Sequence, residues 1–181
     1  MAIFRSRMLL EDTRQQLDKH TLKHEWWESE GVPIVRTKLV VGDYSIVGIN
    51  IFVDTKKDIY EIYGNITQAH DRFKRECVLA RDIGAELIIL VENDHGVTTI
   101  EDLARWKEPL DHFDMRRYKS RNRYAKRQSG ERLAKAMITM HDRYGVRFEF
   151  CTPEDAARRV LELLDYWGGE DSGQRNGQGG D

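Results

Sequence analysis

The sequence has few of the features that mark secreted or membrane proteins. Its two cysteines, Cys77 and Cys151, lie far apart and form no CxxC pattern, so we expect reduced, partly buried thiols. No apolar run approaches the roughly 18–20 residues that a membrane-spanning helix needs. The N-terminal MAIFRSRMLLED has neither the apolar segment nor the small-residue cleavage site of an export signal. We therefore expect a cytoplasmic or nucleoid-associated protein that is neither secreted nor inserted in a membrane.

Net charge is also small, at −2 from 29 Lys+Arg and 31 Asp+Glu. A near-neutral chain argues against a nucleic-acid partner, but here the average hides a separation of charge. Residues 115–130 (MRRYKSRNRYAKRQSG) hold seven cations and no acid. The last 14 residues hold three acids and one arginine, so the net charge of residues 1–167 is zero. Without the seven cations of 115–130, the rest of residues 1–167 carries a net charge of −7. The sequence thus places one strongly basic segment within an acidic body.

The length and the pattern of apolar residues predict one α/β domain. A chain of 181 residues with 40% apolar residues is long enough to bury a core, and we assign residues 1–167 to the domain and 168–181 to a disordered, glycine-rich tail. Periodicity and turn residues predict strands at 8–10, within 34–57, at 85–93 and at 146–151, and helices at 14–30, 67–83, from 99, at 131–144 and after 152–153. This order of elements implies a mixed sheet covered by helices.

Two acids and a lysine are expected to converge at one edge of this sheet. Asp43 lies at a Gly-Asp turn that enters a strand, and Asp54 and Lys56 lie near the far end of the next strand. Positions i and i+2 of a strand share a face, so Asp54 and Lys56 point the same way, and a hairpin would bring Asp43 close to them.

This combination suits phosphodiester hydrolysis. Carboxylate oxygens at Asp43 and Asp54 would hold Mg²⁺ or Mn²⁺, with the peptide carbonyl of Thr55 as a further ligand. Lys56 would orient the attacking water or stabilise the developing charge. The alternative is an exposed strand end whose charges are merely solvated, because Asp-x-Lys on a strand often arises by chance.

The spaced motifs around these residues resemble those of the XPF-type nuclease family, a branch of the PD-(D/E)xK nucleases. Its elements are D-x-R-E after the first strand, then G-D-Y, then E-R-K, then an arginine on the following helix. The positions that match or stand in for them are Asp12 and Arg14, Gly42-Asp43-Tyr44, Asp54-Thr55-Lys56, and Arg72. The resemblance covers residues 8–92 and implies a restriction-endonuclease-like mixed central sheet flanked by helices.

Several positions depart from the family pattern. Gln15 replaces a glutamate, Asp54 shortens the usual glutamate by one methylene, and Tyr60 stands where the family has an acid. The resemblance implies that Asp12, Arg14 and Arg72 support the catalytic residues Asp43, Asp54 and Lys56. Arg14 and Arg72 each have a plainer alternative: a cap on strand carbonyls for Arg14, and a helix-surface ion pair with Glu76 for Arg72. Glu92, at the end of a buried strand, is one more acid that could approach the site.

The basic segment is the second feature that points to nucleic acid. Its cations can neutralise phosphates, and its tyrosines can stack on unpaired bases. We predict that this surface comprises Arg116, Arg117, Tyr118, Lys119, Arg121, Arg123, Tyr124, Lys126 and Arg127. The alternative is a loop that only aids solubility.

The expected function is a metal-dependent DNA endonuclease, which the resemblance implies is selective for flap, fork or junction structures in repair or recombination. A catalytically inactive DNA-binding or scaffold subunit is the alternative, and a junction-resolving, restriction-type or exonucleolytic enzyme would share the same site. The family's helix-hairpin-helix module is not expected here, so a homodimer or a partner subunit is a possible source of additional DNA grip. No G-x-x-x-x-G-K-[ST] loop is present, so no nucleotide cofactor is expected.

Overall fold

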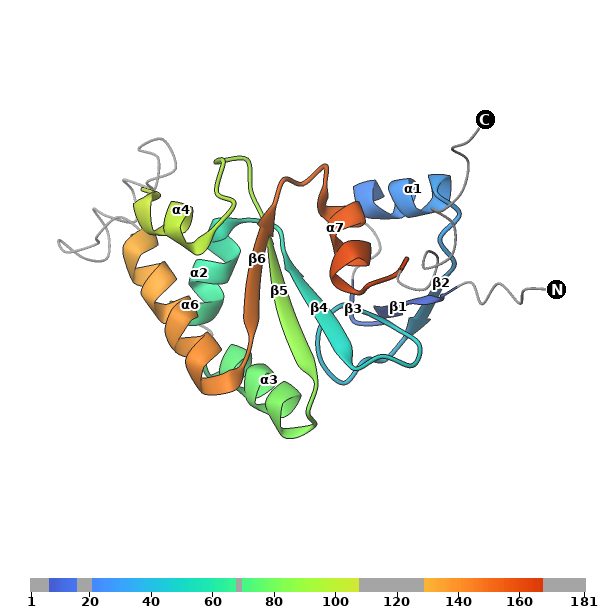
Figure 1. The fold of residues 1–181 in the computed structure, drawn as a ribbon, viewed down its shortest axis with the longest axis horizontal. Helices are drawn as coiled ribbons and strands as arrows, with labels where there is room; N and C mark the ends of the chain where they lie inside the picture. The colour runs from blue at the N-terminus through green and yellow to red at the C-terminus, as the bar shows by residue number, and fades with distance from the viewer. Residues whose placement is uncertain (1–6, 16–20, 68–69, 108–128, 168–181) are drawn as a thin grey trace, which may run out of the picture.

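The computed structural model describes residues 7–15, 21–67, 70–107 and 129–167, and a six-stranded sheet forms its centre (Figure 1). The strands lie in the spatial order β2-β1-β3-β4-β5-β6. Their bounds are β1 Leu9–Asp12, β2 Ile34–Thr37, β3 Tyr44–Ile46, β4 Ile51–Lys56, β5 Glu86–Glu92 and β6 Arg147–Cys151. The sheet is mixed, as the sequence predicted.

Strand β3 alone runs against the other described strands. It pairs antiparallel with both β1 and β4, whereas the pairs β1/β2, β4/β5 and β5/β6 are parallel. The carboxyl ends of β1, β4 and β5 therefore lie at the same edge of the sheet as the start of β3. This topology gathers residues that are far apart in the sequence at that edge.

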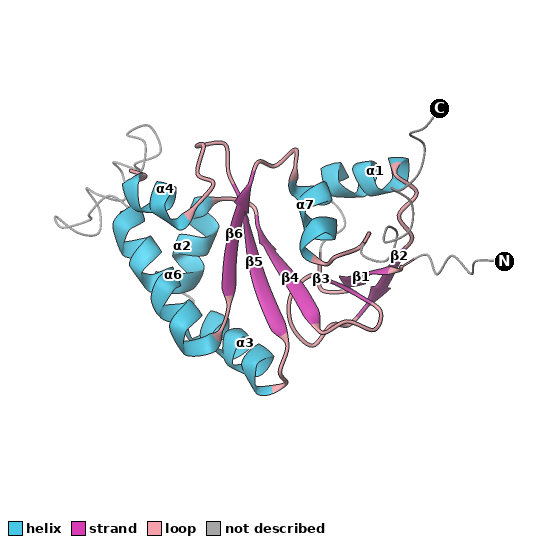
Figure 2. Ribbon diagram, in the orientation of Figure 1, coloured by secondary structure: helices cyan, strands magenta, loops and turns pink. Residues whose placement is uncertain are grey.

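Helices cover both faces of the sheet (Figure 2). One face carries α2 (Ile59–Thr67), α3 (His70–Asp82), α4 (Ile100–Arg105) and α6 (Gly130–Tyr144), and the other carries α1 (Thr21–Ser29) and α7 (Ala156–Leu163). Strand β5 shows why both are needed, because its apolar residues alternate between the two cores: Leu87, Ile89 and Val91 face the first group, and Ile88 and Leu90 the second. No helix in the described ranges is long and apolar enough to cross a membrane.

The helix predicted at 14–30 is shorter than expected, and its first residues belong to a turn. Arg14 donates its backbone N–H to Asp12 Oδ1 at 2.7 Å, which is a local side-chain bond that competes with helix formation. The helical segment that the structure describes is Thr21–Ser29, and residues 16–20 lie outside the described ranges. This places Arg14 next to Asp12 and not on a helix.

Helix α2 was not predicted. It begins after Asp58, whose Oδ1 accepts from Glu61 N at 2.7 Å, and it buries Ile59, Ile62 and Ile66 at helical spacing. The predicted helix start at Thr67 is also wrong, because Thr67 ends α2 and its hydroxyl donates to the Tyr63 carbonyl. The two cysteines are free, as expected, with Cys77 buried and Cys151 half-buried.

Candidate active site

Asp43 is held at the edge of the sheet by two neighbouring strands, β1 and β4. Its backbone N–H donates to the Val53 carbonyl at 2.9 Å, and its own carbonyl accepts from Asp12 N at 2.8 Å. Its carboxylate accepts two hydrogen bonds at Oδ2, from the backbone N–H and the hydroxyl of Thr55, at 2.8 and 2.9 Å. The predicted hairpin is therefore present, and it places Asp43 beside the end of β4.

Asp54 and Lys56 form a buried ion pair on the face of β4 that is covered by α2 and α3. Nζ of Lys56 lies 2.7 Å from Asp54 Oδ1 and 2.6 Å from Oδ2. Lys56 is only 8% exposed and Asp54 only 4%. The Phe73 ring of α3 lies beneath the ammonium, with its centroid 6.0 Å away. The alternative of a solvated strand end is thus wrong for these two residues.

Each charge at this edge changes the pKa values of its neighbours. Burial, followed by the charge of Asp54, raises the pKa of Asp43 well above its usual value, although Lys56 and the Thr55 hydrogen bonds act in the opposite direction. Burial alone would lower the pKa of Lys56, but the carboxylates of Asp54 and Asp43 outweigh it and raise that pKa. Lys56 therefore stays cationic at neutral pH.

The donor set fits a hard divalent cation. Asp54 Oδ2 is buried and makes no hydrogen bond, although the Lys56 ammonium lies beside it. A cation could use that oxygen together with Asp43 and the Thr55 carbonyl, all of which are hard oxygen donors. Within the described residues, however, no three His, Cys, Asp or Glu side chains form a ready-made ligand group. Waters or a substrate phosphate would have to complete the coordination.

A second contact at the same edge joins the buried Asp12 carboxylate to the exposed side chain of Arg14. Arg14 binds the Asp12 carboxylate through Nε and Nη2 at 2.8 and 2.6 Å, and the Leu39 N–H donates to the same carboxylate at 2.9 Å. Burial would raise the pKa of Asp12, but the hydrogen bonds from Arg14 and Leu39 lower it overall. Arg14 also donates to the Leu39 carbonyl at 3.2 Å, which lies in the loop after β2 and not in a strand.

Arg72 and Glu76 do not pair with each other in the described structure. Arg72 is exposed on α3, whereas the Glu76 carboxylate turns inward and accepts from Gly42 N at 2.9 Å. Burial and then the charge of Asp54 raise the pKa of Glu76. The sequence indicates Glu76 only as a partner of Arg72, because no short-range signal reveals a contact that spans 34 residues.

Glu92 belongs to the opposite face of the sheet. It forms a buried ion pair with Lys23 of α1, and nearby on that face Glu11 accepts from His24 at 2.8 Å. Burial raises the pKa of Glu92, although Lys23 acts against that shift. The suggestion that Glu92 approaches the site is therefore wrong for its side chain, which instead fastens α1 to the sheet.

The predicted basic surface lies outside the described residues and stays a prediction. Its residues are Arg116, Arg117, Tyr118, Lys119, Arg121, Arg123, Tyr124, Lys126 and Arg127.

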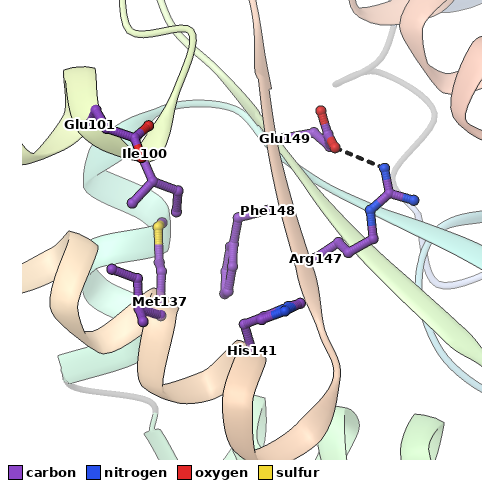
Figure 3. Close-up of a pocket in the computed structure, with 8 residues that line it drawn as sticks. Ile100, Glu101, Met137, His141, Arg147, Phe148 and Glu149 are labelled. Carbon is purple, nitrogen blue, oxygen red and sulfur yellow. Dashed lines mark hydrogen bonds and ion pairs between the residues drawn. The ribbon is translucent and has the colours of Figure 1, made fainter.

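A hollow of about 290 Å³ is lined by residues of α4, α6 and β6, among them Met137, His141 and Phe148 (Figure 3). Two of its charged residues, Arg147 and Glu149, pair with each other at 2.9 Å. Its lining residues include neither Asp43 nor Asp54 nor Lys56, so the hollow is separate from the candidate active site.

The six-stranded mixed sheet with helices on both faces is a nuclease-like α/β fold. It is similar to the solved structure of XPF from Aeropyrum pernix, with a TM-score of 0.56 and 20% sequence identity over 87% of this chain and 64% of that chain. The chain thus spans less than two thirds of the solved chain's length, and an identity this low supports the fold alone. The restriction-endonuclease-like architecture expected from the sequence is confirmed. No protein-family model and no curated protein matches the chain.

Proposed function

We propose that this protein is a metal-dependent endonuclease that hydrolyses DNA phosphodiester bonds, with selectivity for flap, fork or junction structures. The observation that carries the proposal is the convergence of Asp43, Asp54 and Lys56 at one edge of a nuclease-like sheet. Placing two carboxylates beside a buried ammonium costs folding free energy, because charges lose their hydration when they are buried. A catalytic role in phosphodiester hydrolysis would explain why the fold keeps them there.

Each residue has a distinct role in this proposal. Asp43 and Asp54 would hold Mg²⁺ or Mn²⁺, with the Thr55 carbonyl as a third donor. The bound cation would neutralise the scissile phosphate and activate water for attack on phosphorus. Lys56 stays protonated because its pKa is raised, so it stabilises the developing negative charge and does not act as a general base.

Two further contacts support the site. The backbone N–H of Asp12 ties the end of β1 to Asp43, and Arg14 binds the Asp12 carboxylate. The Arg14 side chain is still 60% exposed, which leaves it able to meet a phosphate. Arg72 is exposed on α3 and would make a further phosphate contact. The basic segment supports a nucleic-acid substrate, whereas the choice of DNA and a role in repair or recombination rest on the likeness to an XPF structure alone.

The test is to incubate labelled duplex, flap, splayed-arm and four-way-junction DNA with Mg²⁺ and either the wild type or Asp54→Ala. The proposal expects the wild type to cut at least one branched substrate faster than the duplex, and the variant to bind it without cutting. Cleavage that survives Asp54→Ala would refute the site. Tight binding of branched DNA without cleavage by the wild type would instead establish a scaffold subunit.

A further inference from the structure

The turn that presents Asp43 is unusually constrained at the residue before it. Gly42 is buried and has φ of +67°, a backbone conformation that favours glycine. A Cβ at this position would meet the Val53 carbonyl oxygen at 3.1 Å and Phe52 Cβ at 3.2 Å. The turn is therefore pressed against β4, and small displacements of Gly42 would be transmitted directly to Asp43.

Helix α3 binds the backbone of this turn through the Glu76 side chain. Glu76 Oε1 accepts from the backbone N–H of Gly42 at 2.9 Å, across 34 residues of sequence. The helix is a rigid support, because the neighbouring Phe73 and Cys77 are buried in the core. Together with the bonds that Asp43 makes to Val53 and Asp12, this contact fixes the Gly42–Asp43 backbone from α3, β4 and β1.

Two other roles for Glu76 fit the structure less well. A surface ion pair with Arg72 is not formed in the described residues, since the carboxylate points away from it to Gly42. A place among the metal ligands is not supported either, because the described residues contain no group of three suitable side chains. The contact with Gly42 is what remains, and it is directed at the residue beside a proposed metal ligand.

We propose that Glu76 is a positioning residue of the active site: its side-chain oxygen holds the Gly42–Asp43 turn so that the Asp43 carboxylate faces the end of β4. The inference rests on the proposed function, because the orientation of Asp43 matters for chemistry only if Asp43 holds the cation. An acceptor oxygen suffices for this role. Glu76→Gln should therefore preserve it, and Glu76→Ala should not.

The test compares Glu76→Ala, Glu76→Gln and the matched control Asp82→Asn, which removes an exposed carboxylate at the end of the same helix. Hydrogen exchange of the Gly42 amide is measured by NMR in metal-free protein, and Mn²⁺ affinity by calorimetry without DNA. We expect Glu76→Ala to accelerate the exchange and to weaken Mn²⁺ binding about tenfold each, which corresponds to one lost charge-assisted hydrogen bond. Glu76→Gln should stay within about threefold of the wild type in both, since a neutral acceptor retains most of the bond.

A kinetic measurement separates positioning from general loss of structure. In Glu76→Ala, the apparent constant for Mn²⁺ should rise while kcat at saturating Mn²⁺ stays close to that of the wild type. Equal losses in Glu76→Gln and Glu76→Ala would overturn the inference, because the charge and not the acceptor would then matter. Unchanged Gly42 exchange in Glu76→Ala would overturn it as well. If the wild type neither binds Mn²⁺ nor cuts DNA, the proposed function fails and this inference fails with it. If the wild type does both, the proposed function stands, and the Glu76 variants test only the positioning role.

Discussion

Asp43 accepts both of its side-chain hydrogen bonds from Thr55, and both at the same oxygen, Oδ2. The other oxygen, Oδ1, makes no hydrogen bond within the part of the chain that the structure describes. Thr55 therefore fixes the rotation of the Asp43 carboxylate and leaves one oxygen for a ligand. At Asp54, Oδ1 accepts from Lys56, whereas Oδ2 makes no hydrogen bond to the described residues but lies 2.6 Å from the same ammonium.

Removing the Thr55 hydroxyl should loosen this arrangement. Thr55→Val keeps the shape of the side chain but deletes one of two hydrogen bonds to a carboxylate, so we expect a loss of about 1–2 kcal/mol in the free energy of unfolding at pH 7. Thr55→Ser is the matched control, because it retains the hydroxyl. Urea unfolding measures both, and equal stability of the Val and Ser variants would show that the hydroxyl does not hold Asp43.

Gly42 should tolerate a methyl group less well than another glycine with the same backbone conformation. Gly42 and Gly84 have φ of +67° and +68°, but a Cβ at Gly84 would meet nothing within 4 Å. Gly84→Ala should therefore cost about 1 kcal/mol from backbone strain alone. Gly42→Ala adds the close contacts with β4, so we expect about 2–4 kcal/mol and weaker Mn²⁺ binding. Equal costs for the two substitutions would contradict the packing described here.

Lys56 should be needed for cleavage but not for metal binding. Its ammonium lies 2.6 Å from Asp54 Oδ2, the oxygen that a cation would use, so Lys56→Met removes a competitor and should leave Mn²⁺ binding intact or tighter. The rate of cleavage should nevertheless fall about a hundredfold, because the group that stabilises the developing charge is lost. Calorimetry and single-turnover cleavage separate the two effects. Loss of Mn²⁺ binding in Lys56→Met would show that the lysine mainly maintains the fold.

The ion pair between Lys23 and Glu92 should matter for folding and not for chemistry. Both residues are buried, so Lys23→Met leaves the Glu92 carboxylate buried without its partner. We expect this to lower the free energy of unfolding by about 3–5 kcal/mol at pH 8. The pKa of Glu92 is already raised by burial, and a raised carboxyl pKa favours the folded state at low pH and disfavours it as pH rises. The cost should therefore shrink toward pH 4.

The matched control for this pair is Lys135→Met, because Lys135 pairs with Glu131 in an exposed i,i+4 contact on α6. Urea unfolding across pH should show little change in that variant. A Lys23→Met protein that is as stable at pH 8 as the control would mean that the pair contributes nothing to the attachment of α1.

The hairpin that joins Asp43 to Asp54 and Lys56 was predictable because its determinants are local. A Gly-Asp turn and the two-residue period of a strand together fix which side chains meet. Helix α2 was not predicted although the sequence carries its signals, Asp58 as a cap and isoleucines at helical spacing, because these isoleucines directly follow the β-branched strand pattern that ends at residue 57.

The contacts of Glu76 and Lys23 could not be predicted in the same way. Glu76 reaches Gly42 from a different layer of the fold, and Lys23 meets Glu92 across 69 residues. Neither residue has a local pattern that distinguishes it from an ordinary charged position on a helix surface. Such contacts depend on how whole helices pack on the sheet, which periodicity does not specify.

The most direct test of the account is single-turnover cleavage of a labelled flap DNA by the wild type, Asp54→Asn and Asp82→Asn, each confirmed as folded by circular dichroism. We predict that Mg²⁺ starts cleavage and EDTA stops it, that Asp82→Asn matches the wild type, and that Asp54→Asn is slower by at least about a hundredfold. Cleavage by Asp54→Asn at the wild-type rate, or cleavage by the wild type in EDTA, would contradict a cation-dependent site at Asp43 and Asp54.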